Sequence, residues 1–254
     1  MINYYNLDAI AELENTRIIS PYGFKYGFVR SIFKEDVYKD LIKSFPDVTK
    51  FKLTDKSDSG GGRKRFYVGL NYYSGEKWGS IYHMKELPQI WKDVIKESSS
   101  EELMNLLSDA TGVNFNSLCN FGFTYGNGGC MQEPHIDGAI RPNDPSPIHA
   151  SVACLMYFNE KSGGVAGTAI YDLDRETILF QVTDLRNSFF YFEQHPDSWH
   201  GFPTVPEGHD RRLVSLSYSQ ERRPIPVSES LFSHFFAPYR IKYFIRRAKR
   251  KFNL

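Results

Sequence analysis

The apolar positions of this chain follow two different periods. In the first half they recur at helical spacing, first over residues 34–45, where Pro46 ends the pattern. Residues 88–108 carry the same spacing twice in succession, and Ser100 is typical of the residue that caps a second helix. The pattern therefore predicts three amphipathic helices before residue 110.

From about residue 118 the period changes to that of short β-strands separated by Gly, Asn, Asp and Pro. The strands that this pattern predicts are 118–125, 149–159, 167–173, 176–182, 188–194 and 212–219. Helices followed by a run of strands at such spacing favour a mostly β fold with flanking helices (α+β), an antiparallel sandwich or jelly roll supported by helices. Residues 231–252 return to a helical pattern with a basic face.

Length and composition limit the class of protein. The 254 residues suit one large domain, or one domain with an appendage. No run approaches the roughly 18 apolar residues of a transmembrane helix, and the first residues do not resemble a secretory signal. The three cysteines lack a C-x-x-C spacing, which favours reduced thiols. We therefore expect a cytoplasmic protein.

The charge is unevenly distributed, although the formal net charge is only +1. Seven cations fall within residues 240–254, and the last acidic residue of the chain is Glu229, so the rest of the chain is net acidic. This tail has two interpretations: a terminal helix that exposes its charges to solvent, or attachment to an anionic surface or polymer, such as the periphery of a membrane. Sequence-specific nucleic-acid binding is not expected, because no motif for it is present.

The stretch "EPHIDGAIRPNDP" contains a candidate metal-binding corner. His135 and Asp137 stand two apart in it, and His200 follows the strand predicted at 188–194. In a β-sandwich, corners that are distant in sequence can lie side by side. Two imidazoles and one carboxylate on one face of a metal leave coordination positions open and suit non-haem Fe(II).

Downstream of His200, Arg211 and Arg212 open the last predicted strand. A buried arginine offers a two-pronged donor to a carboxylate. Side chains alternate across a strand, so only one of the two can point inward. Arg211 shares its face with Leu213 and two serines, whereas Arg212 shares its face with a more apolar set, so Arg211 is favoured and Arg212 stays open as the alternative.

Together, His135-x-Asp137, His200 and Arg211 resemble the Fe(II)/2-oxoglutarate-dependent dioxygenases, within them the prolyl-4-hydroxylase-like branch. Three further stretches, "TYGNGGCMQEPHID", "CLMYFN" and "SGGVAGTAIYD", are similar to strands and turns of that branch. The resemblance covers about residues 118–220. It implies a double-stranded β-helix (jelly-roll or cupin-like) catalytic core at 118–222, a helical and mixed N-terminal buttress of the same domain at 1–117, and a basic helical tail at 223–254.

The resemblance also implies a reaction and roles for residues. His135, Asp137 and His200 would be the catalytic iron ligands, Arg211 and Tyr157 would hold the far carboxylate of 2-oxoglutarate, and Tyr125 would lie near this co-substrate. The enzyme would use O2 to hydroxylate an unactivated C–H bond of a protein side chain, glycan or small molecule, releasing succinate and CO2. Ascorbate is a further candidate cofactor.

Two other functions remain open, and so does the role of one loop. The chain could be a non-catalytic, cupin-like metal-binding β-sandwich module, or a cupin metalloenzyme that needs no co-substrate. The Gly-rich stretch 54–65 is either a solvated connection or a lid over the site. Consumption of 2-oxoglutarate is the observation that separates the three functions.

Overall fold

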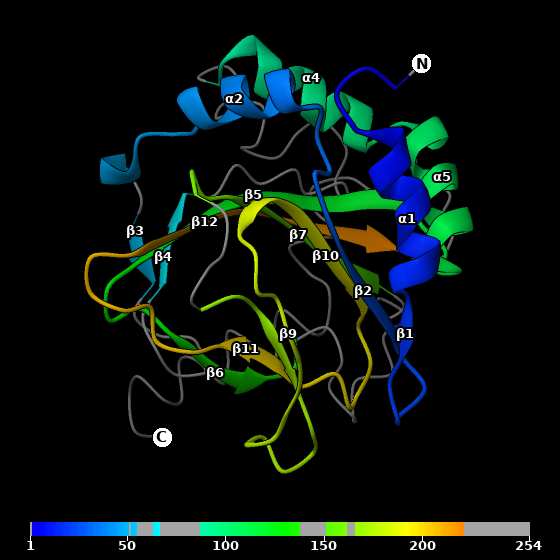
Figure 1. Cartoon of the computed structure of the whole chain (residues 1–254), viewed down its shortest axis with the longest axis vertical. Coiled ribbons are helices and arrows are strands. Elements are labelled where there is room, and N and C mark those ends of the chain that lie inside the picture. The colour runs from blue at the N-terminus through cyan, green and yellow to red at the C-terminus, as the bar shows by residue number, and fades with distance from the viewer. Residues whose placement is uncertain are drawn as a thin grey trace, which may run out of the picture.

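The computed structural model describes residues 2–50, 52–54, 63–66, 87–137, 151–161 and 166–220 (Figure 1). These residues form two antiparallel β-sheets, one of eight strands and one of four, with helices on the outer face of the larger sheet. The prediction of a mostly β fold with flanking helices is confirmed.

The larger sheet runs through the middle of the described structure. Its strands, in spatial order, are β1 (Ile18–Ile19), β2 (Lys25–Arg30), β10 (Arg186–Glu193), β7 (Ser151–Phe158), β12 (Asp210–Ser219), β5 (Ser117–Asn127), β4 (Arg63–Phe66) and β3 (Lys52–Thr54). The smaller sheet has the order β6 (Gln132–His135), β11 (His200–Phe202), β8 (Ala169–Tyr171) and β9 (Ile178–Gln181). Strands from both ends of the described chain therefore meet in one sheet.

The helices lie together on one side of the larger sheet (Figure 1). They are α1 (Leu7–Thr16), α2 (Glu35–Lys43), α4 (Gln89–Ser98) and α5 (Glu101–Thr111), with a 3-10 turn at Val48–Lys50. The cap predicted for α5 is confirmed, because the Ser100 hydroxyl accepts a hydrogen bond from the backbone N–H of Leu103. Helix α1 was not predicted from the sequence.

Two apolar cores lie on the two faces of the larger sheet. Between sheet and helices, the Trp91 ring meets Phe123 and Phe158 edge-on, at centroid distances of 4.8 and 5.1 Å. Between the two sheets, the core contains Leu213 and Phe190 from the larger sheet. Alternation along β12 assigns residues to these cores as predicted, since Val214, Leu216 and Tyr218 all lie on the helix side.

The six predicted strands are all present, with ends shifted by a few residues. Six further strands were not predicted: β1, β2, β3 and β4 of the larger sheet, and β6 and β11 of the smaller sheet. The start of the strand predicted at 149–159 lies outside the described residues, and β7 begins at Ser151. Strand β6 contains Pro134, which ordinarily argues against a strand. It is tolerated because β6 forms the edge of its sheet, where one side of the backbone needs no partner.

Two predictions cannot be compared with the structure. The basic tail 223–254 and most of the stretch 54–65 lie outside the described residues, so attachment to an anionic surface and a lid both stay predictions. Within the residues that are described, none of the helices combines the length and apolarity needed to cross a membrane.

Candidate metal centre and adjoining anion site

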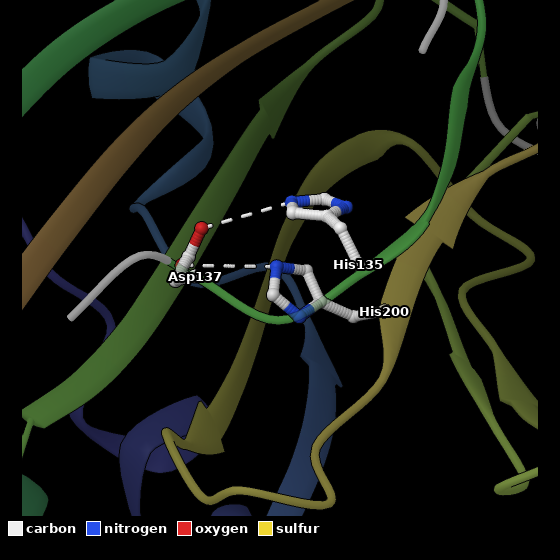
Figure 2. A group of neighbouring side chains, drawn as sticks. All are labelled: His135, Asp137 and His200. Atoms are coloured by element: carbon white, nitrogen blue, oxygen red, sulfur yellow. Dashed lines mark ion pairs between the residues drawn. The ribbon is translucent and has the colours of Figure 1, made fainter. Parts of the chain in front are cut away.

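Strands β6 and β11 place two histidines opposite each other. His135 ends β6, His200 begins β11, and the two residues are direct partners in the antiparallel pairing. Their rings lie 4.3 Å apart between centroids (Figure 2). The pairing is close because Gly201 has no side chain: a Cβ there would lie 2.5 Å from the backbone oxygen of Gln132.

Asp137 completes the group two residues beyond β6. Its Oδ1 lies 3.7 Å from His135 Nε2, and its Oδ2 lies 3.7 Å from His200 Nε2. One ligand atom from each of the three residues lies within 4.8 Å of the others, which suits a shared metal ion. Figure 2 shows the carboxylate directed toward both imidazoles. The structure thus brings together the three predicted ligands.

Backbone carbonyls orient both imidazole rings. His135 Nδ1 lies 2.9 Å from the carbonyl oxygen of Glu133, and His200 Nδ1 lies 2.9 Å from that of Ser198. A carbonyl only accepts, so each Nδ1 carries a hydrogen, and in a neutral imidazole Nε2 then presents a lone pair. The side-chain nitrogen of Gln132, which only donates, lies 2.8 Å from His135 Nε2 and agrees with this tautomer. The neutral form of each ring therefore directs Nε2 to the position where it can bind a metal.

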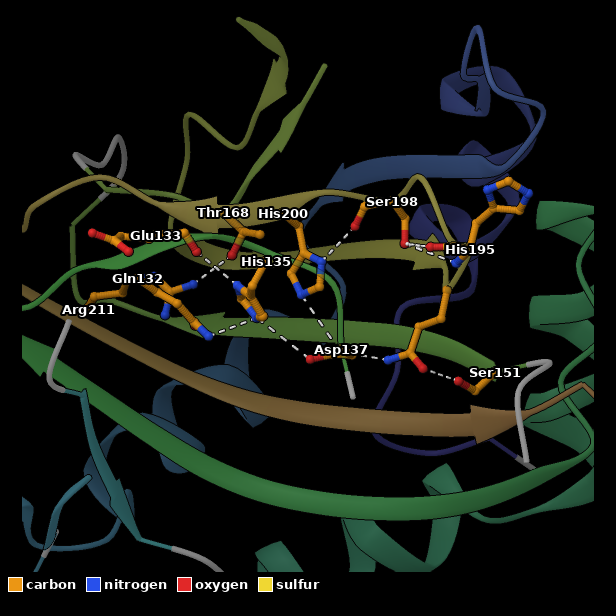
Figure 3. A network of polar contacts seen from close by, with 11 residues as sticks. Gln132, Glu133, His135, Asp137, Ser151, Thr168, His195, Ser198, His200 and Arg211 are labelled. Carbon is orange, nitrogen blue, oxygen red and sulfur yellow. Dashed lines mark hydrogen bonds and ion pairs between the residues drawn. The ribbon is translucent and has the colours of Figure 1, made fainter. Parts of the chain in front are cut away.

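A glutamine holds the carboxylate of the group. Gln194 Nε2 donates a hydrogen bond of 2.7 Å to Asp137 Oδ2, and the side-chain oxygen of Gln194 accepts from the Ser151 hydroxyl (Figure 3). Gln194 directly follows β10 and Ser151 begins β7, and both strands belong to the larger sheet. The larger sheet therefore orients Asp137, which follows the edge strand of the smaller sheet. All three candidate ligands thus have a partner that fixes their direction.

Arg211 lies close to this group and is buried. The residue is 3% exposed, and its guanidinium carbon lies 4.1 Å from the centroid of the Phe202 ring, two residues after His200. Nη2 donates a hydrogen bond of 2.6 Å to the Thr168 hydroxyl, whereas Nε has no hydrogen-bond partner within the described structure. Nor does any acidic side chain of the described ranges form an ion pair with Arg211.

A buried cation without an anionic partner is costly. Burial lowers the pKa of the Arg211 guanidinium, but an arginine remains protonated at neutral pH. The positive charge and the unsatisfied Nε together indicate a binding site for an anion between the two sheets.

Tyr157 and Thr168 complete the surroundings of Arg211. The Tyr157 hydroxyl donates to Thr168 Oγ1 at 2.7 Å and accepts from the Thr168 backbone N–H at 3.2 Å. Thr168 Oγ1 thus accepts from both Tyr157 and Arg211, which leaves its own hydrogen to be donated. The cluster offers an anion a guanidinium and a hydroxyl from different elements.

The two adjacent arginines occupy different environments. Arg212 lies at the surface, where its Nε donates to Asp210 Oδ2 at 2.8 Å and its Nη1 lies 3.7 Å from Glu160 Oε1. These two carboxylates neutralise its charge. Of the two arginines that the sequence left open, Arg211 is the one that lies between the sheets.

Tyr125 does not join this cluster, which corrects its predicted position. Residues directly paired across two strands point to the same face, and Tyr125 pairs with Arg212. Its side chain packs against the helix-side core, and burial raises its pKa. The sequence similarity gave the correct strand but could not give the register, and a shift of one residue exchanges the two faces.

Sequence reasoning missed three residues of the site: Gln132, Thr168 and Gln194. Thr168 had a weak signal, as a hydroxyl residue at the start of a strand with apolar neighbours. Gln132 and Gln194 had none, because a glutamine near a strand end is also typical of exposed positions. Only the three-dimensional arrangement assigns them to the site.

Solved structures share this fold. An oxidoreductase of the 2OG-Fe(II) oxygenase family from Burkholderia pseudomallei matches with a TM-score of 0.55 and 10% identity, over 88% of this chain and 97% of that chain. The non-heme alpha ketoglutarate dependent epimerase SnoN from nogalamycin biosynthesis matches with a TM-score of 0.53 and 10% identity, over 87% of each chain. A Pseudomonas putida prolyl-4-hydroxylase matches with a TM-score of 0.51 and 10% identity, over 85% of this chain and 98% of that chain.

Neither a family model nor a curated protein matches the chain in sequence. The chain therefore shares its fold with these three proteins, and only its own site residues can indicate its reaction.

Proposed function

We propose that this protein is an Fe(II)- and 2-oxoglutarate-dependent dioxygenase whose two sheets form a double-stranded β-helix. The observation that carries the proposal is the buried, positively charged Arg211 beside a group of two histidines and one aspartate. A metal site alone has no use for such an arginine. A co-substrate that chelates the metal at one end and has a carboxylate at the other requires both.

His135, Asp137 and His200 would hold the iron. Two imidazole nitrogens and one carboxylate oxygen are the donor set typical of non-haem Fe(II) sites with open positions. Both histidines already present their Nε2 lone pairs, and Gln194 orients the carboxylate. The residues present therefore fit this metal.

Arg211 would bind the far carboxylate of 2-oxoglutarate, with Thr168 beside it. The planar guanidinium can direct two N–H groups at two carboxylate oxygens, and Nε is the donor that still lacks a partner. The Thr168 hydroxyl would donate to the same carboxylate, and Tyr157 would keep that hydroxyl in position. Tyr157 would thus act through Thr168, whereas Tyr125 packs on the helix side of the larger sheet.

When bound, Fe(II) and 2-oxoglutarate supply the activation of O2 that hydroxylates an unactivated C–H bond, with release of succinate and CO2. The protein positions the reacting groups and shields them from water. The aromatic rings of Phe192 and Phe202 line the neighbourhood of His200 and Arg211, which excludes water from the reacting centre. Ascorbate would serve as an external reductant.

We further propose that residues 118–222 form the catalytic core, that 1–117 buttress it, and that 223–254 form a basic tail. The substrate is a protein side chain, a glycan or a small molecule, since this fold serves many substrates.

Two alternative functions explain fewer of the residues in this site. A structural metal module would need a fourth ligand, and the described residues provide three in the group. A metalloenzyme without a co-substrate would leave Arg211 unpaired.

The test is an anaerobic titration of the purified protein with Fe(II) and 2-oxoglutarate. Chelation of the co-substrate produces a weak visible charge-transfer band, which we expect in the wild type but not in His135→Ala. Arg211→Leu should form the band only at higher 2-oxoglutarate concentration, whereas Arg212→Leu should behave as the wild type. A folded, iron-loaded wild type that forms no band would overturn the assignment of the co-substrate.

A further inference from the structure

Gln194 differs from the other residues around the metal group because it donates to the carboxylate and not to an imidazole. Its side-chain nitrogen lies 2.7 Å from Asp137 Oδ2. Glutamine nitrogen and oxygen are easily exchanged in an assignment, but here the partners decide. Asp137 as a carboxylate only accepts, so the nitrogen must face it and the oxygen must face the Ser151 hydroxyl.

The backbone around Gln194 forms a fixed platform. The backbone N–H of Gln194 donates to the carbonyl of Ser151 at 2.9 Å, which extends the pairing of β10 with β7 by one residue. The preceding residue, Glu193, pairs with Val152 in the same ladder, and its carboxylate accepts from the backbone N–H of Lys25 at 2.7 Å. The amide of Gln194 is therefore held at both its backbone and its side chain.

Asp137 is the most exposed of the three candidate ligands. It lies beyond the end of β6, and its side chain is 39% exposed, compared with 12% for His135 and 9% for His200. A carboxylate in such a position can turn toward solvent. The hydrogen bond from Gln194 opposes this rotation and directs Oδ2 toward the larger sheet, while Oδ1 faces His135.

We propose that Gln194, anchored by Ser151, is a positioning residue that holds the Asp137 carboxylate in the orientation in which it would bind a metal together with His135 and His200. This inference rests on the proposed function, because it assumes that Asp137 is a metal ligand. Figure 3 shows Asp137 and Ser151 joined by dashed lines through the side chain between them. Gln194 touches neither metal nor substrate and acts through Asp137 alone.

The test compares Gln194→Leu with a matched control, Gln220→Leu. Both glutamines donate an amide hydrogen bond to a carboxylate, but Gln220 bonds to Glu193, which lies outside the metal group. The measurements are the Kd for Fe(II) under anaerobic conditions and the Tm of the metal-free protein. We expect Gln194→Leu to weaken Fe(II) binding by about 10–100-fold, the range typical of outer partners of metal ligands. Its metal-free Tm should equal that of Gln220→Leu, whose Kd should match the wild type.

Ser151 provides the second comparison. Ser151→Ala removes the anchor of the glutamine and should weaken Fe(II) binding less than Gln194→Leu does. Ser151→Thr keeps the hydroxyl and should restore the wild-type Kd. If Gln194→Leu lowers the metal-free Tm but leaves the Kd unchanged, Gln194 has a structural role and the inference fails while the proposed function stands. If the wild type itself does not bind Fe(II), the proposed function fails.

Discussion

Arg211 and Arg212 are neighbours in β12, yet one is buried between the two sheets and the other pairs with surface carboxylates. Strand alternation alone produces this difference. It also supplies a comparison within the protein, because the same substitution at adjacent positions should have unequal effects.

Replacing Arg211 with leucine should raise the Kd for 2-oxoglutarate by about 30-fold or more. Loss of one partner of a buried, hydrogen-bonded charge pair typically costs roughly 2–5 kcal/mol. Arg212→Leu should change the Kd by less than about fivefold, since exposed ion pairs contribute roughly 0–1 kcal/mol. Calorimetric titration of the iron-loaded protein under anaerobic conditions measures both values. Equal effects at the two positions would contradict the assignment of Arg211 to the co-substrate.

Thr168→Val should weaken 2-oxoglutarate binding by about fivefold, because it removes one hydrogen bond of roughly 1 kcal/mol without changing the shape of the side chain. Tyr157→Phe should act in the same direction. Since Tyr157 acts through Thr168, the double variant should lose less than the sum of the two single losses. Additive losses would show that Tyr157 contacts the co-substrate independently of Thr168.

Gln132→Leu should bind Fe(II) about fivefold more tightly than the wild type. In the metal-free protein the Gln132 side chain donates to His135 Nε2, and a metal at this nitrogen must displace that bond of roughly 1 kcal/mol. Titration with Fe(II) at a fixed pH gives the Kd. Weaker binding in this variant would indicate that Gln132 supports the metal-bound state instead.

Gly201→Ala should weaken Fe(II) binding and lower the Tm. The added Cβ would lie 2.5 Å from the Gln132 carbonyl oxygen, so β11 must move away from β6 and separate the two histidines. Gly126→Ala is the control, because a Cβ there lies 3.5 Å from its nearest neighbour, an ordinary contact. Thermal unfolding and metal titration of both variants test this, and a Gly201→Ala protein with the wild-type Kd would contradict it.

Much of the fold could be predicted because local patterns determine it. The alternation along β12 and the helical spacing of residues 34–45 both correspond to buried faces in the structure. The short strands β6 and β11 could not be predicted, because three or four residues carry no periodic signal. These two strands nevertheless hold both histidines.

The site could be predicted only in part. Spacing and residue type indicated His135, Asp137 and His200, and strand alternation favoured Arg211. The position of Tyr125 could not be obtained in this way, because the face on which it lies depends on the pairing register of β5 with β12. The contacts of Gln132 and Gln194 with the metal group could not be predicted from the sequence, because they depend on which residues the fold brings next to these two amides.

The cross-strand histidine pair has a further consequence for the dynamics of the smaller sheet. Among the described strands β6 pairs with β11 alone, and this pairing includes an irregularity next to His200. An ion shared by His135 and His200 would cross-link these strands, so its binding energy would also oppose their local opening. Amide hydrogen exchange in β6 and β11 should therefore slow on metal loading, while exchange in the centre of the larger sheet stays unchanged. The rate at which the smaller sheet opens would then depend on whether the protein holds a metal.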